Sequence, residues 1–166
     1  MAHNIHGIIT SFKYEGELPH IILVGNYHII PFQNTYGPNY SDQILEPYEE
    51  LTKEIRKILK ELSFNGKCAY IETNYFGGPG TQMCEVWENG TKILGPLISF
   101  DGIDQPKVPE GAKLWKNSIN EALKTIGIYK HEGMDEFDSV RLGWYRSNTA
   151  MIEEYEKTQH YKKQHG

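Results

Sequence analysis

The sequence CAYIETNYFGGPGTQMCEVWEN, residues 68–89, decides the fold. Two runs rich in aromatic and β-branched residues are joined by Gly77-Gly78-Pro79-Gly80, a connection made entirely of turn-forming residues. Strand-forming runs on either side of such a connection are typical of a β-hairpin. We therefore predict an antiparallel hairpin whose turn is centred between residues 78 and 79.

This register places two carboxylates opposite each other. Glu72 would pair with Glu85, and Asn74 with Met83, on one face of the sheet. Like charges directly opposite each other destabilise a sheet by up to about 1 kcal/mol, so the pair needs a compensating cation or a raised pKa. Three interpretations are open: an acid/base pair of a hydrolase, an acidic patch that receives a partner's Lys or Arg, or a purely structural arrangement. In the last, the register is shifted by one or two residues or a nearby Lys neutralises the charges.

The glycines of the turn do not form a nucleotide-binding loop. A P-loop needs Gly-x-x-x-x-Gly-Lys-Ser/Thr ahead of a helix, whereas here Thr81 opens a strand. We favour a wide hairpin turn that needs positive φ. The bare backbone at Gly78 would also let another protein approach closely, with Tyr75 and Phe76 beside it as anchors.

Other segments predict further strands and helices around the hairpin. Strand-like patterns lie at 7–14, 20–32 and 91–94, and Gly25-Asn26 is either a bulge within the second run or a tight turn that splits it in two. Helical periodicity predicts three helices. One ends at Leu62, with its N-cap at Ser41 or Asp42 or a start near Pro47, one spans 112–126, and one runs to about Lys163 with Ser147 or Asn148 as its cap. We predict a single α+β domain over residues 1–166. Its mainly antiparallel sheet would have about five or six strands, with two or three amphipathic helices packed on one face.

The charge balance bears on the class of partner. The chain has 22 acidic and 17 basic residues, a net charge of −5, and only three arginines. Negative charge disfavours nonspecific binding to nucleic acid and to anionic membranes, and it favours a partner with a basic surface. No run approaches the roughly 18 apolar residues of a membrane span, and the first residues do not resemble a secretory signal. We therefore expect a cytoplasmic protein without a membrane or nucleic-acid partner.

The sequence predicts no metal and no cofactor. His20 and His28 stand at the two ends of one strand-like run, about 26 Å apart if that run is extended, which is too far to share an ion. Cys68 and Cys84 form no Cys-x-x-Cys pattern, and the predicted register keeps them apart, so two reduced thiols are expected. No Gly-x-Ser-x-Gly motif occurs. We therefore assign no catalytic residue and favour a binding protein over an enzyme.

In general character, as a small acidic chain without a catalytic signature, the sequence is similar to bacterial immunity proteins, which neutralise a basic toxin enzyme. The likeness is one of character, and it assigns no residue a role. It implies a protein-binding domain, an immunity or inhibitor protein for a basic partner such as a toxin nuclease. The hairpin itself supplies the candidate contact residues: Glu72, Tyr75, Phe76, Gly78, Glu85 and Trp87. The alternative is a small-molecule-binding protein or hydrolase with a cleft lined by Glu72 and Glu85. Secondary candidates, which would fold over such a cleft, are Arg141, Trp144, Tyr145 and Arg146.

Overall fold

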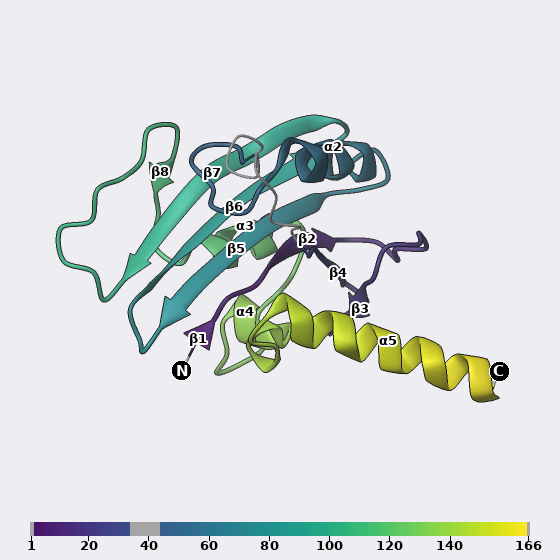
Figure 1. The fold of residues 1–166 in the computed structure, drawn as a ribbon. Coiled ribbons are helices and arrows are strands. Elements are labelled where there is room, and N and C mark those ends of the chain that lie inside the picture. The colour runs from purple at the N-terminus through teal and green to yellow at the C-terminus, as the bar shows by residue number, and fades with distance from the viewer. Residues whose placement is uncertain (1, 34–43, 166) are drawn as a thin grey trace.

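The computed structural model describes residues 2–33 and 44–165, and Figure 1 shows helices packed against one twisted sheet. Within these residues the sheet has eight strands: β1 Ala2–His3, β2 His6–Thr10, β3 Ile21–Ile22, β4 His28–Pro31, β5 Cys68–Phe76, β6 Gly80–Glu88, β7 Thr91–Asp101 and β8 Lys113–Leu114. The helices described are α2 Lys53–Leu62, α3 Ser118–Thr125, α4 Glu136–Ser139 and α5 Asn148–His165, with a 3-10 turn, η1, at Leu142–Trp144. None of these helices is long and apolar enough to cross a membrane.

The strands follow the order β3-β4-β2-β5-β6-β7-β8, and β1 also pairs with β5. All pairings are antiparallel except that of β7 with β8. The α+β class and the mainly antiparallel sheet are therefore confirmed. The expected count of five or six strands is too low, because β1, β3 and β8 are each two residues long and leave no alternating pattern in the sequence.

The β5–β6 hairpin has a different register from the predicted one. Glu72 lies opposite Met83 and Glu85 opposite Tyr70, so the predicted pairing of the two carboxylates is wrong by two residues. The turn is tight rather than wide: the N–H of Phe76 donates to the carbonyl of Pro79 over 3.1 Å. Its two central residues are the glycines at 77 and 78, with φ of 64° and 109°. Positive φ at both central positions suits a two-residue hairpin turn, which explains the shift.

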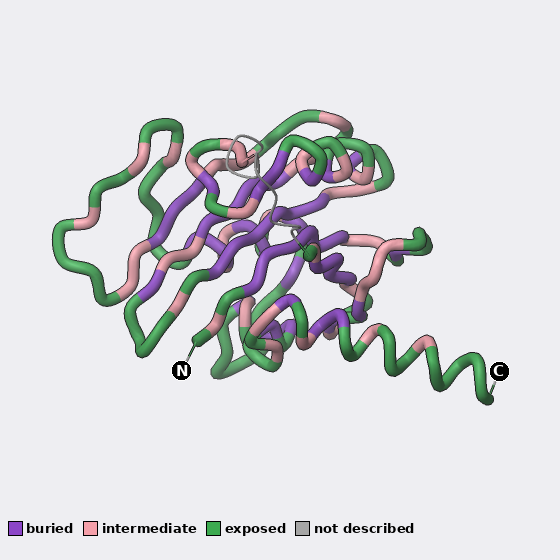
Figure 2. The backbone as a smooth tube through the Cα atoms, viewed as in Figure 1, coloured by how far each residue is buried: buried purple, intermediate pink, exposed green. Residues whose placement is uncertain are grey.

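Helices cover both faces of the sheet, not one face as predicted. On one face, Ile55 of α2 packs in the same core cluster as Tyr70 of β5. On the other, Leu123 of α3 and Met151 of α5 pack in the same cluster as Ile71. The central strands are consequently buried on both sides, as Figure 2 shows, and all five residues of β2 are buried. Such strands carry apolar residues at consecutive positions, which is typical of a sheet between two helical layers.

The helix boundaries differ from the predicted ones at two of the three starts. Regular helix α2 begins at Lys53, and the side chain of Thr52 caps it by accepting from the N–H of Ile55 at 3.1 Å. The alternative caps Ser41 and Asp42 lie outside the described residues. α3 begins at 118 rather than 112, because residues 113–114 form β8 instead. α5 begins at 148 as predicted, and Figure 1 shows its C-terminal half extending away from the sheet.

Candidate functional site

Glu85 is completely buried between α2 and the sheet. The Arg56 guanidinium donates to both of its carboxylate oxygens, from Nη2 to Oε1 at 2.6 Å and from Nε to Oε2 at 3.2 Å. The indole Nε1 of half-buried Trp87 donates to Oε2 at 2.6 Å. These bonds compensate the charge of Glu85 within the protein, so this carboxylate anchors α2 and presents no charge to a partner.

Glu72 is also buried, on the same face, but has its own set of donors. Its carboxylate accepts from the Tyr70 hydroxyl at 2.7 Å and from the backbone N–H groups of Glu50 and Glu49 at 2.9 and 3.1 Å. Burial raises the pKa of Glu72 to about 7, although these three hydrogen bonds act in the opposite direction. The residue therefore fixes the segment that leads into α2.

The predicted association of the two carboxylates is correct only in part. The structure brings both onto one face beneath α2, yet each is occupied by neighbouring groups. Neither lines a cleft of about 220 Å³ between β3 and α5, nor either of the two clefts described below. Sequence reasoning missed Arg56, whose position on the inward side of α2 follows only once the helix is docked.

The tip of the hairpin is held in place by a polar network. The Tyr75 hydroxyl donates to the carboxylate of Asp101 at the end of β7, and Gln82 Nε2 donates to the same hydroxyl at 3.0 Å. Gln82 Oε1 also accepts from the N–H of Ile119 in α3 at 3.1 Å. Phe76, the next residue along, is 80% exposed. Tyr75 is therefore a structural support, whereas Phe76 is available for contact.

Open space surrounds the backbone of the turn. A Cβ built at the glycine at 77 or at Gly78 would have no described atom within 4 Å. On the β7 side, a Cβ built at Gly102 would lie 3.3 Å from the Cα of Pro79, so the loop after β7 runs beside the turn. Asp101 directly precedes Gly102, and Asp104, an exposed residue, follows two positions after it. The surface at the tip thus combines bare backbone, one large aromatic ring and acidic groups.

The four secondary candidates lie elsewhere. Arg141 stacks over the ring of Trp144 at 4.3 Å, and Trp144 is 69% exposed. With Tyr145, they line a cleft of about 190 Å³ beside the edge strand β3. Arg146 donates to the backbone of Ala2 at 3.4 Å. The residues on either side of Arg141 pack on the sheet face opposite Glu72, so the prediction that this segment folds over the hairpin carboxylates is wrong.

Two histidines lie much closer together than predicted. The rings of His20 and His28 are 5.6 Å apart between centroids, because the chain reverses between them: the N–H of Leu23 donates to the carbonyl of Tyr27 at 2.6 Å. Asn26 adopts positive φ in this turn, with φ of 65°. The separation of about 26 Å, which assumed a fully extended run, is therefore wrong, whereas the alternative of a tight turn at Gly25-Asn26 is confirmed. Among the described residues, no three His, Cys, Asp or Glu side chains are grouped closely enough to hold a metal ion.

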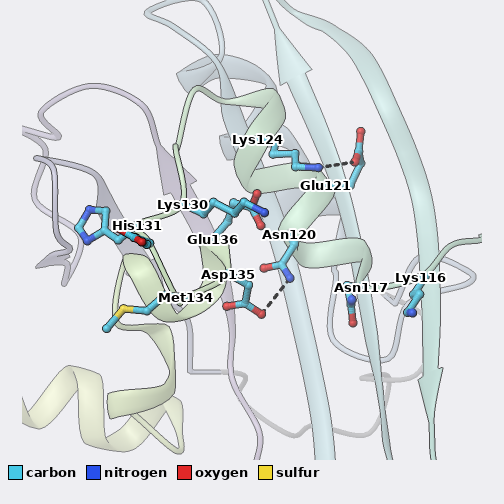
Figure 3. Close-up of a pocket in the computed structure, with 12 residues that line it drawn as sticks. Lys116, Asn117, Asn120, Glu121, Lys124, Lys130, His131, Met134, Asp135 and Glu136 are labelled. Atoms are coloured by element: carbon cyan, nitrogen blue, oxygen red, sulfur yellow. Dashed lines mark hydrogen bonds and ion pairs between the residues drawn. The ribbon is translucent and has the colours of Figure 1, made fainter.

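The largest of the three clefts has a volume of about 680 Å³ and lies between α3 and the segment that leads into α4 (Figure 3). Its lining is polar and carries both signs of charge: Lys116, Asn117, Asn120, Glu121, Lys124, Lys130, His131, Glu132, Gly133, Met134, Asp135 and Glu136. Sequence reasoning did not find this cleft, because it assigned most of these residues to turns and to the exposed side of a helix.

Comparison of the chain with protein-family models, with curated proteins and with solved structures found no match. Its function is therefore argued from the geometry and chemistry of its own surface.

Proposed function

We propose that the chain is a protein-binding domain whose main contact is the tip of the β5–β6 hairpin. The proposal rests on the exposure of Phe76, a large apolar side chain that stands out from the end of β5 next to an open turn. Exposed aromatic residues in such positions supply much of the energy of protein interfaces, because they bury a large area on contact. The bare turn beside it lets a partner's backbone approach closely.

The rigidity of the tip supports this role. Tyr75 is bonded to both Asp101 and Gln82, so the end of the hairpin is tied to β7 and, through Gln82, to α3. A contact surface that is ordered before binding loses less conformational entropy when the partner docks. Phe76 is thus presented by a fixed scaffold.

A basic partner, such as a toxin enzyme neutralised by an immunity protein, fits the charge of this surface. The net charge is −5, Asp101 ends β7 beside the turn, and Asp104 lies in the loop that follows. On the other side, Glu49 accepts from the amide of Asn74 in β5 at 3.0 Å. The exposed carboxylates of Asp104 and Glu49, rather than buried Glu72 and Glu85, would provide the steering that accelerates association with a cationic surface.

Affinity purification from the native host, followed by quantitative mass spectrometry, tests the proposal. Phe76→Ala should lose a basic partner that wild type retains, with an affinity loss of about 1–3 kcal/mol expressed mainly as faster dissociation. The matched control is Tyr129→Ala, because Tyr129 is 87% exposed and lies in the segment after α3. Asp104→Asn should slow association and weaken its salt dependence.

The contact surface would be assigned differently by other results. If Trp144→Ala abolishes capture while Phe76→Ala does not, the partner binds beside β3 and the hairpin proposal is wrong. Equal losses in Phe76→Ala and Tyr129→Ala would show nonspecific stickiness instead. All variants must keep the wild-type melting temperature for the comparison to count.

The alternative of a hydrolase built on Glu72 and Glu85 has less support. Such an enzyme needs a cleft that admits substrate to both carboxylates. Arg56 covers one of them, and the backbone of residues 49–50 covers the other. We therefore retain the binding function.

A further inference from the structure

Glu136 occupies an unusual position in the 680 Å³ cleft. It is only 5% exposed, yet it belongs to the lining of the cleft. Within residues 2–33 and 44–165, no hydrogen bond or ion pair reaches its carboxylate. Its oxygens keep a small accessible area, unlike the Tyr48 hydroxyl, which is fully buried without a partner. They are therefore open to the cleft that the residue lines, where water or a ligand can reach them. An unoccupied acceptor of this kind points to a ligand that supplies the missing donor.

Neighbouring polar groups in the cleft are already engaged. The two oxygens of Asp135 accept from Asn120 Nδ2 at 3.0 Å and from the N–H of Asp138 at 2.8 Å. Asn120 Oδ1 in turn accepts from the N–H of Phe137 at 2.9 Å. Figure 3 shows Asn120 of α3 bonded across the cleft to Asp135. These contacts join α3 to α4 and hold Glu136 in a fixed frame.

The cations of the cleft do not neutralise Glu136. Lys124 lies 4.0 Å from Glu121 on its own helix. Lys116 and Lys130 are exposed, and in the described part of the chain neither forms an ion pair with Glu136. Exposed lysines are well hydrated and need no partner, whereas the carboxylate of Glu136, which is only 5% exposed, has little room for water. Among the described residues, the Glu136 carboxylate therefore lacks a positively charged hydrogen-bond donor.

We propose that this cleft binds a guanidinium or ammonium group, which donates hydrogen bonds to the Glu136 carboxylate. Both groups carry several N–H donors and a positive charge, and hydrogen bonds between ions are the strong ones. The cleft volume lies in the range of small-molecule sites, so there is room for the chain that bears the cation. The site is independent of the hairpin tip and goes beyond the proposed protein-binding function.

Titration with agmatine, a small guanidinium compound, tests the site in the ¹⁵N-labelled full chain by NMR. We expect saturable shifts among residues 116–136 and no saturable response to butylurea, which has the same four-carbon chain but neither the guanidinium nor the ammonium charge of agmatine. Glu136→Gln keeps the shape of the side chain and should weaken agmatine binding at least about tenfold. The matched control is Glu132→Gln, because Glu132 lines the same cleft but is exposed; its affinity should change less than about threefold.

Stability provides a second readout. Glu136→Gln removes a charge that no group in the described residues pairs, so its melting temperature should equal or exceed that of wild type, as is common when a ligand-binding group is replaced. A clear decrease would overturn the proposal, because it would show that the carboxylate has a structural partner. The proposal is also overturned if agmatine binds to the Lys130→Gln variant but not to wild type. That result would show that the Lys130 side chain itself occupies the position of the ligand in the wild-type protein. Equal weakening by Glu132→Gln would also overturn it, by showing nonspecific attraction.

The source of the cation is resolved by comparing agmatine with the capped peptide acetyl-Gly-Gly-Arg-Gly-Gly-amide. Binding of both, with loss of both in Glu136→Gln, assigns the site to an accessible side chain as well as to a free amine. Binding of agmatine alone assigns it to a small molecule. Failure of both probes to bind overturns the proposal and leaves the hairpin function untouched.

Discussion

Arg56 of α2 and Glu85 of β6 form a two-point ion pair across the helix–sheet interface, with contacts of 2.6 and 3.2 Å. The Glu85 side chain is fully buried, whereas the Arg56 side chain is 26% exposed. The guanidinium therefore covers the carboxylate from the solvent side and keeps its charge compensated. This pair fixes where α2 crosses the sheet, and it removes Glu85 from the surface that a partner could meet.

Replacing Arg56 with Met should destabilise the protein by about 3–5 kcal/mol, because it leaves Glu85 buried without its cation. Urea unfolding measures the loss. The control is Lys67→Met, which breaks a surface pair at 3.7 Å with Glu88 and should cost less than about 1 kcal/mol. Adding Glu85→Gln to Arg56→Met should recover part of the stability. A cost for Arg56→Met no greater than that of the control would contradict the assigned role.

The second prediction concerns pH, through the buried carboxylate of Glu72. Its pKa is raised from 4.5 to about 7 by burial, so the folded protein holds a proton that the unfolded chain releases above pH 4.5. The contribution of Glu72 to the free energy of unfolding is fully present below the pKa that Glu72 has in the unfolded chain. It decreases by about 3 kcal/mol in total as the pH rises toward and through 7. The Glu72→Gln variant has no carboxyl group at this position, so it neither binds nor releases this proton. The free energy of unfolding of wild type, relative to the variant, should therefore fall between pH 4.5 and 7.

The test compares how the free energy of unfolding changes with pH in the two proteins, and not its absolute value. The reason is that a glutamine amide has one oxygen and cannot accept from both backbone N–H groups that Glu72 binds through its two oxygens. The variant is expected to be less stable than wild type at the acidic end. Parallel pH profiles for the two proteins would refute the raised pKa.

Local patterns predicted the strand and helix content well, but not the layers. Alternation and turn residues located β5, β6 and the start of α5, since these signals act over a few residues. The sequence also indicated that the sheet is buried on both faces, because its strands carry consecutive apolar residues such as Ile8-Ile9 and Tyr70-Ile71. We predicted a single helical layer because the helices were considered one at a time. The paired glycines likewise indicated a two-residue turn, which would have given the observed register.

The candidate site was less predictable, because it depends on contacts between distant segments. Arg56 and Glu85 are 29 residues apart, and Glu136 lines a cleft with residues of α3 only once α3 and α4 have packed together. Glu72 and Glu85 stood out in the sequence because of their charge, yet charge alone does not show whether a strand residue is covered by a helix. Phe76 was identified correctly as an exposed-tip residue because the turn beside it is visible in the sequence.

The last prediction tests the support of the hairpin tip through Gln82. Its amide donates to the Tyr75 hydroxyl while its carbonyl accepts from the N–H of Ile119, so both halves of the side chain are used. Gln82→Glu keeps the acceptor but loses the donor, and the Tyr75 hydroxyl already gives its proton to Asp101. Two acceptors would then face each other, which should cost about 1–3 kcal/mol at pH 7.

Chemical denaturation at two pH values measures this effect. The penalty should shrink toward pH 4, because a protonated carboxyl group at this position can donate to the Tyr75 hydroxyl again. Gln105→Glu is the control: Gln105 is exposed, and its substitution should change stability by no more than about 0.5 kcal/mol. If Gln82→Glu is as harmless as the control, or if its penalty does not depend on pH, then the network does not hold the tip. Phe76 would in that case stand on a mobile end of the hairpin, and the argument from a preordered contact surface would fail.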